Sequence, residues 1–201
     1  MLTNGPAAIS VANNGIANNN LTNGGVGMPN YIKDLSLTAG PGGDNLWKIG
    51  ELTYAEPQAL KQYLAIVAGE SGNNLQEAQA IGSVIMNRLA VKGASLEGDF
   101  VSKIGGIGQY DAIGGDIYNS IMASSWEDIF NSNNIYATRI SGAFSPLVWN
   151  QDYSGGAYFW NASSPQTGFN WNCYNNGTFT ITNTFGGTTF FKYTNINKTW
   201  P

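Results

Sequence analysis

A single glutamate between two predicted helices is the residue best placed for acid–base chemistry. Glu70 ends an apolar helical repeat and precedes Ser71 and Gly72. A carboxyl group at the end of a buried helix loses part of its hydration, which disfavours the charged form and raises the pKa. Such an acid stays protonated nearer neutral pH and can give its proton to a leaving oxygen. A Glu that caps or pairs at a helix end would have the same spacing, so both roles stay open here.

Two amphipathic helices are predicted to hold Glu70 in a helix–helix corner. Pro57 suits the first turn of the helix before it, because the missing N–H costs nothing there. Asn74 is predicted to cap the helix after it, with Glu77 in capping-box position. Apolar residues recur at three- and four-residue spacing in both, at Leu60, Tyr63, Leu64 and Val67, and then at Ala78, Ile81, Ile85 and Leu89.

Six motifs follow one another in order between residues 54 and 193. They are Gly69-Glu70, Glu77-Ala78-Gln79, Asn87-Arg88, Gly108-Gln109-Tyr110, Gly156-Ala157-Tyr158-Phe159 and the hairpin at 184–191. This ordered set resembles the spore-cortex-lytic, cell-wall-hydrolase family of peptidoglycan glycosidases. The resemblance implies an α+β, lysozyme-like fold with a mainly helical core and a small C-terminal antiparallel β-hairpin region. It also implies cleavage of the glycan strand between N-acetylmuramic acid and N-acetylglucosamine, with Glu70 as general acid/base. No cofactor or metal is expected.

The chain departs from the family pattern at two positions. Asn74 stands where the family often has a second Glu, and Thr188 stands where its closing hairpin often carries His. The run Glu70-Ser71-Gly72 with a later Gly-x-Gly-Gln is also similar to lytic transglycosylases, which work with a single Glu. Whether water or the muramic acid 6-hydroxyl attacks the sugar therefore stays open.

Five residues are candidates for substrate binding beside Glu70. Gln109 has an amide for sugar hydroxyls or acetamide groups, and Tyr110 has a ring for a sugar face. Asp111 is the nearest candidate for a second carboxylate. Gln79 could reach the cleft or face solvent, and Tyr158 could line a glycan cleft or pack in the core, so both alternatives stay open for each. A tight structural turn with a core Tyr would explain 108–110 equally well.

Composition excludes several other functions. The net charge is −4, and nine Lys and Arg are outnumbered by thirteen Asp and Glu, so a nucleic-acid binder is not expected. No stretch is long enough to span a bilayer. The chain has no His, which removes His-based triads and His-ligated metals and disfavours a peptidoglycan amidase. Its single Cys173 cannot form an internal disulfide.

The organisation predicted along the chain is a leader followed by one domain. Residues 1–45 are rich in Asn and Gly and are expected to be a flexible leader, and 46–201 form the catalytic domain. Residues 139–150 are expected to be a turn-rich connection, and alternation around Gly186-Gly187 predicts a β-hairpin.

No recognisable export signal explains how the protein would be delivered to the cell wall. The start of the chain lacks the basic and apolar runs of a Sec signal, so release on lysis, injection or another non-classical route is expected. Injection would imply an immunity protein that plugs the cleft. The competing hypothesis is a non-catalytic glycan-binding or structural module of a phage tail or secretion particle.

Overall fold

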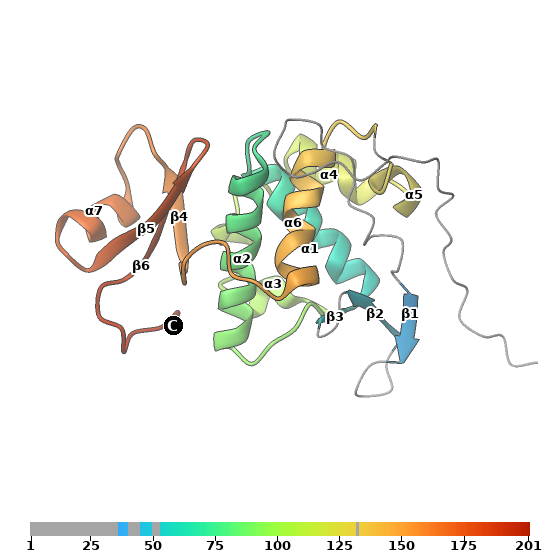
Figure 1. The fold of residues 1–201 in the computed structure, drawn as a ribbon, viewed down its shortest axis with the longest axis horizontal. Helices are drawn as coiled ribbons and strands as arrows, with labels where there is room; N and C mark the ends of the chain where they lie inside the picture. The colour runs from blue at the N-terminus through green and yellow to red at the C-terminus, as the bar shows by residue number, and fades with distance from the viewer. Residues whose placement is uncertain (1–35, 40–44, 50–52, 132) are drawn as a thin grey trace, which may run out of the picture.

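The computed structural model describes residues 36–39, 45–49, 53–131 and 133–201. Helices and two small antiparallel sheets make up these residues, so the predicted α+β class is confirmed (Figure 1). In chain order the elements are β1 (Ser36–Ala39), β2 (Asn45–Ile49), β3 (Thr53–Ala55), α1 (Pro57–Glu70), α2 (Leu75–Val91), α3 (Phe100–Lys103), η2 (Ile107–Gln109), α4 (Asp116–Ala123), α5 (Trp126–Ile129), α6 (Ala137–Trp149), β4 (Phe159–Ala162), α7 (Phe169–Asn175), β5 (Phe179–Phe185) and β6 (Thr188–Tyr193).

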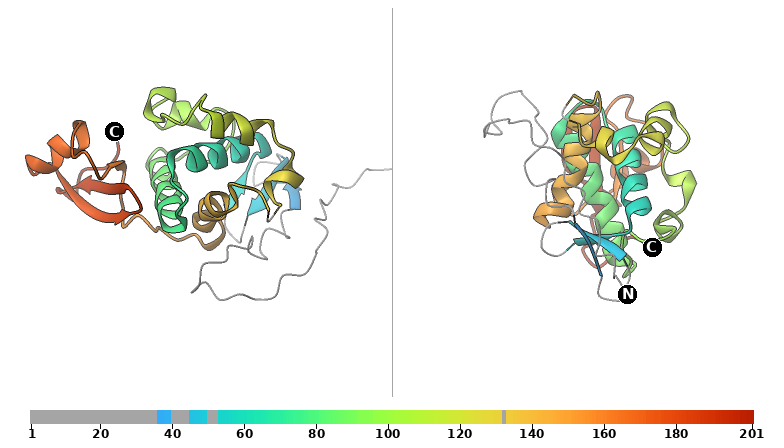
Figure 2. Two further views of the ribbon diagram at one scale, coloured as in Figure 1. Left: turned by 90° about the horizontal axis from the view of Figure 1, so that it is seen from above. Right: turned by 90° about the vertical axis from the view of Figure 1, so that its right-hand side faces the viewer.

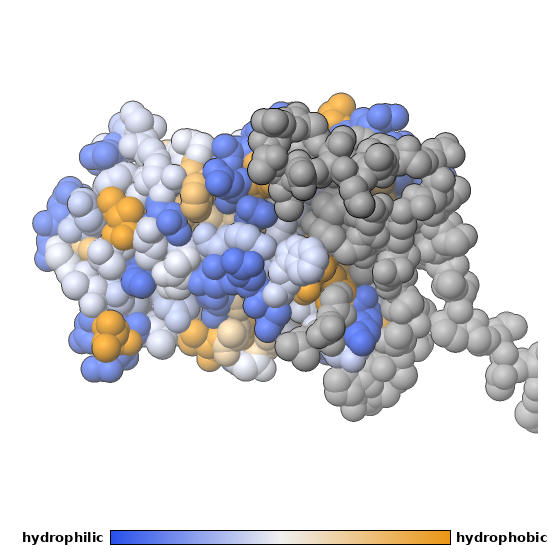
Figure 3. All heavy atoms as spheres, in the orientation of Figure 1, coloured by the Kyte–Doolittle hydropathy of each residue, from blue (hydrophilic) through white to orange (hydrophobic). Residues whose placement is uncertain are grey.

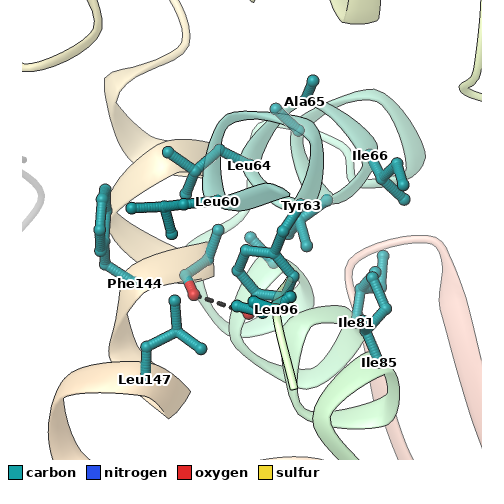
Figure 4. Packing of buried hydrophobic residues seen from close by; sticks show 14 of the residues in the cluster. Leu60, Tyr63, Leu64, Ala65, Ile66, Ile81, Ile85, Leu96, Phe144 and Leu147 are labelled. Carbon is teal, nitrogen blue, oxygen red and sulfur yellow. Dashed lines mark hydrogen bonds between the residues drawn. The ribbon is translucent and has the colours of Figure 1, made fainter. Parts of the chain in front are cut away.

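Helix α1 is the centre of the helical body. Pro57 occupies its first turn and the helix ends on Glu70, as the sequence predicted. Most of its length is buried, because α2, α4 and α6 pack around it. Tyr63 is fully buried in this core, and its hydroxyl donates a 2.8 Å hydrogen bond to the backbone oxygen of Ala143 in α6 (Figure 4). Burying the polar end of a tyrosine requires such a partner, so this bond fixes α1 against α6.

The sequence predicted a turn-rich connection over residues 139–150, and that prediction was wrong. Nearly all of these residues belong to helix α6. The helix contains Pro146 and Gly142, both weak helix formers, but tertiary packing outweighs their propensity. Gly142 faces α2 so closely that an added Cβ would lie 2.5 Å from the Cβ of Ala78. Gly142 has a low helix propensity, but its lack of a side chain allows α6 to pack closely against α2.

The N-terminal sheet has the strand order β1-β2-β3 and was not predicted. β1 pairs with β2, with Leu37 opposite Trp47, and β2 pairs with β3. Because β1 falls inside the segment 1–45 that the sequence analysis interpreted as a leader, the folded part begins ahead of Leu46. The rest of that predicted leader, residues 1–35 and 40–44, lies outside the described residues.

The C-terminal sheet stands beside α2 and has the strand order β4-β6-β5 (Figures 1 and 2). β5 and β6 form the predicted hairpin, with Phe185 opposite Thr188 across the Gly186-Gly187 turn. The sheet has a small aromatic core of its own around Phe159, Phe179 and Phe191. The end of the chain returns from this sheet toward α2, where it brings Trp200 onto Arg88.

Among the described residues, no helix is both long enough and apolar enough to cross a membrane. On the face shown in Figure 3, hydrophobic residues form small separate groups among polar ones over the C-terminal sheet and α2. Phe169 and Ile196 are among the exposed apolar residues of the C-terminal region. Scattered exposed apolar residues are ordinary on a folded protein.

We predict that Gly142→Ala destabilises the protein. The new methyl group would lie 2.5 Å from Ala78 Cβ and 2.9 Å from the backbone oxygen of Leu75, so α6 must move away from α2. Overpacking of this kind costs about 1–3 kcal/mol. Two contacts under 3.0 Å place this site in the upper part of that range, so the cost exceeds the gain of about 1 kcal/mol in helix propensity. Chemical denaturation measures the change. Gly108→Ala is the control, because a Cβ there meets nothing within 4 Å; equal stability of the two variants would contradict the packing argument.

Candidate active site

A cleft of about 780 Å³ lies between the helical body and the C-terminal sheet. The helical body contributes Glu70, Glu77, Arg88, Gln109 and Asp111 to its lining. The sheet and the segments joined to it contribute Phe159, Trp160, Asn161, Ala162, Phe169, Asn170, Gly187, Thr188 and Tyr193, and the chain end contributes Trp200 and Pro201. Polar groups and aromatic rings therefore converge on one concave surface, which is the usual form of a ligand site.

Glu70 lies half-buried in this cleft with two neutral donors on its carboxyl group. The backbone N–H of Ala112 donates to Oε1 at 2.8 Å, and the indole N–H of Trp160 donates to Oε2 at 3.4 Å. Burial raises the pKa of Glu70, and the negative charge of Asp111 adds to the rise, while the hydrogen bonds from Ala112 and Trp160 lower it. The net direction is upward. The group is held in place and favours its protonated form more than an exposed Glu would.

A glycine before Glu70 allows the loop of Ala112 to reach the carboxyl group. An added Cβ on Gly69 would lie 2.5 Å from the Cβ of Ala112. Any larger residue at position 69 would push the loop away and with it the N–H that binds Glu70. The Gly69-Glu70 pair therefore has a physical reason: the glycine admits the loop that the glutamate binds.

Arg88 is a buried cation in the lining of the same cleft. Its exposed fraction is 4%, and its side chain donates from Nε to the backbone oxygen of Tyr158 at 2.8 Å and from Nη1 to the hydroxyl of Tyr110 at 3.1 Å. Its guanidinium carbon lies 4.0 Å from the ring centroid of Trp200 and 4.9 Å from that of Trp160. Aromatic faces stabilise such a desolvated cation, and arginine remains charged.

Glu77 joins the turn after Glu70 to the C-terminal hairpin. Its carboxylate accepts from the backbone N–H of Gly72 at 2.8 Å and from the hydroxyl of Thr188 at 2.5 Å. Asn74 caps α2 as predicted, through its bond from the N–H of Glu77. The predicted capping box is therefore formed only in half, because the side chain of Glu77 binds Gly72 and Thr188.

The predicted binding residues are divided between the cleft and its surroundings. Gln109 and Asp111 line the cleft and are exposed. Tyr110 is buried behind it, where its hydroxyl accepts from Arg88. Tyr158 contributes its backbone oxygen to Arg88 and is absent from the cleft lining. Gln79 also lies outside that lining, since its amide donates to Ser145 of α6 at 3.1 Å.

Other cleft residues were not assigned to the site from the sequence. Glu77 was assigned to the cap of a helix, and Arg88 appeared only within the Asn87-Arg88 motif, yet both line the cleft. Thr188 was noted only as the residue that replaces a family His. The signal available for all three is that each lies within one of the motifs that carry the resemblance. Trp200 carries no such signal, since only the folded chain end brings it to Arg88.

Comparisons of the chain with protein-family models, with curated proteins and with solved structures found no match. The interpretation of the cleft therefore depends on its own residues and their geometry.

We predict that the stability gained by Glu70→Gln depends on pH. Burial raises the pKa of Glu70 above its ordinary value of 4.5, so the folded chain binds this proton more tightly than the unfolded chain does. Ionisation of Glu70 therefore costs no stability below the unfolded pKa and costs progressively more as pH rises through the folded pKa. The difference in free energy of unfolding between Glu70→Gln and the parent should grow in that window and then level off. A difference that stays constant with pH would contradict the raised pKa.

We also predict that Thr188→Val destabilises the protein while Thr188→Ser does not. Valine keeps the shape but removes the hydroxyl, which leaves the buried carboxylate of Glu77 with the N–H of Gly72 as its remaining donor. Loss of a hydrogen bond to a buried charged group costs about 1.5–3 kcal/mol. Serine retains the donor and serves as the matched control. Equal midpoints of thermal or denaturant unfolding for Val and Ser would show that this bond adds nothing to stability.

Proposed function

We propose that this chain is a peptidoglycan glycosidase that cleaves the glycan strand between N-acetylmuramic acid and N-acetylglucosamine, with Glu70 as the acid/base. The observation that carries the proposal is a half-buried carboxyl group of raised pKa, held by Ala112 and Trp160 in a cleft of about 780 Å³. A general acid for glycoside cleavage needs properties of this kind: a pKa raised above the usual value of a carboxyl group, a fixed direction and access to the substrate.

The fold proposed with this activity is lysozyme-like. Support comes from the position of Glu70 at the end of a central helix, with a small sheet on the other side of the cleft. The motif order from Gly69-Glu70 to the closing hairpin supports the same fold.

The substrate surface proposed combines a ring with amide groups. Trp160 lines the cleft and donates to Glu70, so its indole lies where a sugar bound at the carboxyl group would pack. Gln109 and Asn161 also line the cleft, and their amides suit hydroxyl and acetamide groups. Amide groups beside an aromatic ring suit an amino-sugar strand, which presents hydroxyl groups, acetamide groups and sugar faces.

The chemistry proposed begins with proton transfer from Glu70 to the glycosidic oxygen. The bond between the anomeric carbon and that oxygen breaks, and positive charge develops on the sugar ring. The ionised Glu70 then accepts the proton of the nucleophile while the nucleophile's oxygen bonds to the anomeric carbon. Glu70 is regenerated, so one carboxyl group serves both halves of the reaction.

The nucleophile we favour is the 6-hydroxyl of the muramic acid, which gives a 1,6-anhydro product without consuming water. Among the described residues that line the cleft, the carboxylates Glu70, Glu77 and Asp111 all come from the helical body. The residues that the sheet contributes to the lining are neutral. Asp111 directly precedes Ala112, whose N–H holds Glu70, so it neighbours Glu70 on the helical side of the cleft. This arrangement favours the single-carboxylate route over a pair of opposed carboxylates.

We predict that Glu70→Gln abolishes lysis of purified peptidoglycan. Glutamine keeps the size and one acceptor oxygen but has no proton to give, so the rate should fall about 10²–10⁴-fold. Turbidity of a peptidoglycan suspension measures the change. Glu127→Gln, at an exposed position, is the matched control and should lyse like the parent. If the parent binds peptidoglycan without clearing it, and Glu70→Gln binds equally, the chain is a glycan-binding module and the proposal is wrong.

Mass spectrometry of the soluble products tests the nucleophile. The 6-hydroxyl route predicts glycan fragments that end in a 1,6-anhydro sugar, and Asp111→Asn should leave this product unchanged. Fragments heavier by one water would assign the reaction to hydrolysis instead. If the parent released that heavier product and Asp111→Asn were inactive, Asp111 would be identified as the base that activates water.

A further inference from the structure

Among the described residues that line the cleft, Arg88 has the basic side chain, and the side chains of Glu70, Glu77 and Asp111 are acidic. The groups that face this region are Glu77 on α2, Tyr110 and Asp111 on the loop, Tyr193 on β6, and Glu70 itself. The negative charge of Asp111 disfavours the ionised form of Glu70 and, after burial, is one of the causes that raise its pKa. A general acid must also be stable after it has lost its proton, and burial together with the charge of Asp111 opposes that state.

The position of the guanidinium is fixed on several sides. Tyr158 and Tyr110 accept its hydrogen bonds, and the rings of Trp160 and Trp200 lie against it. Trp160 joins Arg88 to Glu70 directly, because the indole that lies against the guanidinium also donates to Oε2 of Glu70. With 4% of its surface exposed, the cation is poorly screened by water. A fixed charge in a desolvated site acts over longer distances than an exposed one.

We propose that Arg88 is a positioning residue whose fixed positive charge stabilises the ionised form of Glu70 after proton transfer. Its effect opposes that of burial: burial favours the protonated form of Glu70 before the reaction, and Arg88 limits the cost of the carboxylate that the reaction creates. The same carboxylate must then act as base, so a balanced proton affinity serves both steps. This role in catalysis rests on the proposed function, while the electrostatic coupling itself does not.

The electrostatics of the pair support this coupling. Burial lowers the pKa of Arg88, and the bonded Tyr110 and the negative charge of Glu70 counteract that fall. Coulomb attraction is reciprocal, so the same charge of Arg88 favours the carboxylate of Glu70.

The test is the titration of Glu70 followed by carboxyl ¹³C NMR in the full chain. Arg88→Met removes the charge and keeps an apolar stem, and the midpoint of Glu70 should move to higher pH. Arg88→Lys keeps the charge, and the midpoint should stay closer to that of the parent. A purely structural role predicts the opposite shift in Arg88→Met, because a loosened cleft would hydrate Glu70 and lower its pKa. A midpoint that is unchanged or lower in Arg88→Met would overturn the proposal.

A second measurement needs no substitution at Arg88 and remains informative if Arg88→Met does not fold. The ¹⁵N signal of Arg88 Nε, whose N–H is bonded to Tyr158, should shift with the titration of Glu70 in the parent and lose that step in Glu70→Gln. An Arg88 signal that ignores the Glu70 titration would overturn the coupling. Both measurements are independent of lysis, so a protein without lytic activity would refute the proposed function and leave the coupling to be decided by NMR.

Discussion

The partial burial of one carboxyl group is the constraint on which the rest of the site depends. Glu70 sits at the end of a helix that the core buries almost entirely, and its Oε1 is held by a backbone N–H from Ala112. Burial raises its pKa, and the donors limit the rise. A more exposed Glu70 would have a lower pKa and so a weaker preference for its protonated form. A Glu70 without these donors would have a carboxyl group with unsatisfied hydrogen bonds in the protein. The helical body and the C-terminal sheet together create this intermediate environment.

Glycines, which have no side chain, are as important to this arrangement as the polar and aromatic groups. Gly69 admits the loop of Ala112, and Gly142 admits α6 to the surface of α2. Gly186 follows the same logic, since a Cβ there would lie 2.8 Å from a carboxylate oxygen of Glu77. Each glycine permits an approach that brings a donor or a helix to its partner. The geometry of the cleft is therefore set by close packing at a few positions and not by a single element.

Local patterns in the sequence were sufficient to predict the two helices around Glu70 and the closing hairpin. Their signals lie within short windows: Pro57 at a first turn, Asn74 at a cap and Gly186-Gly187 at a tight turn. Helix α6 was not predicted, because Gly142 and Pro146 have low helix propensities. The helix forms because packing buries most of its residues. The clustering of Arg88 with Trp160 and Trp200 depends on residues far apart in the chain, and no local pattern encodes it.

The most direct measurement of the central claim is NMR observation of glycan binding by Glu70→Gln, which should bind a strand without cleaving it. An oligosaccharide of alternating N-acetylglucosamine and N-acetylmuramic acid should shift the backbone signal of Ala112 and the indole signal of Trp160, because both donors lie on the carboxyl group that would face the scissile bond. An oligosaccharide that shifts signals on another surface, or that leaves both donors unchanged at saturation, would contradict the account.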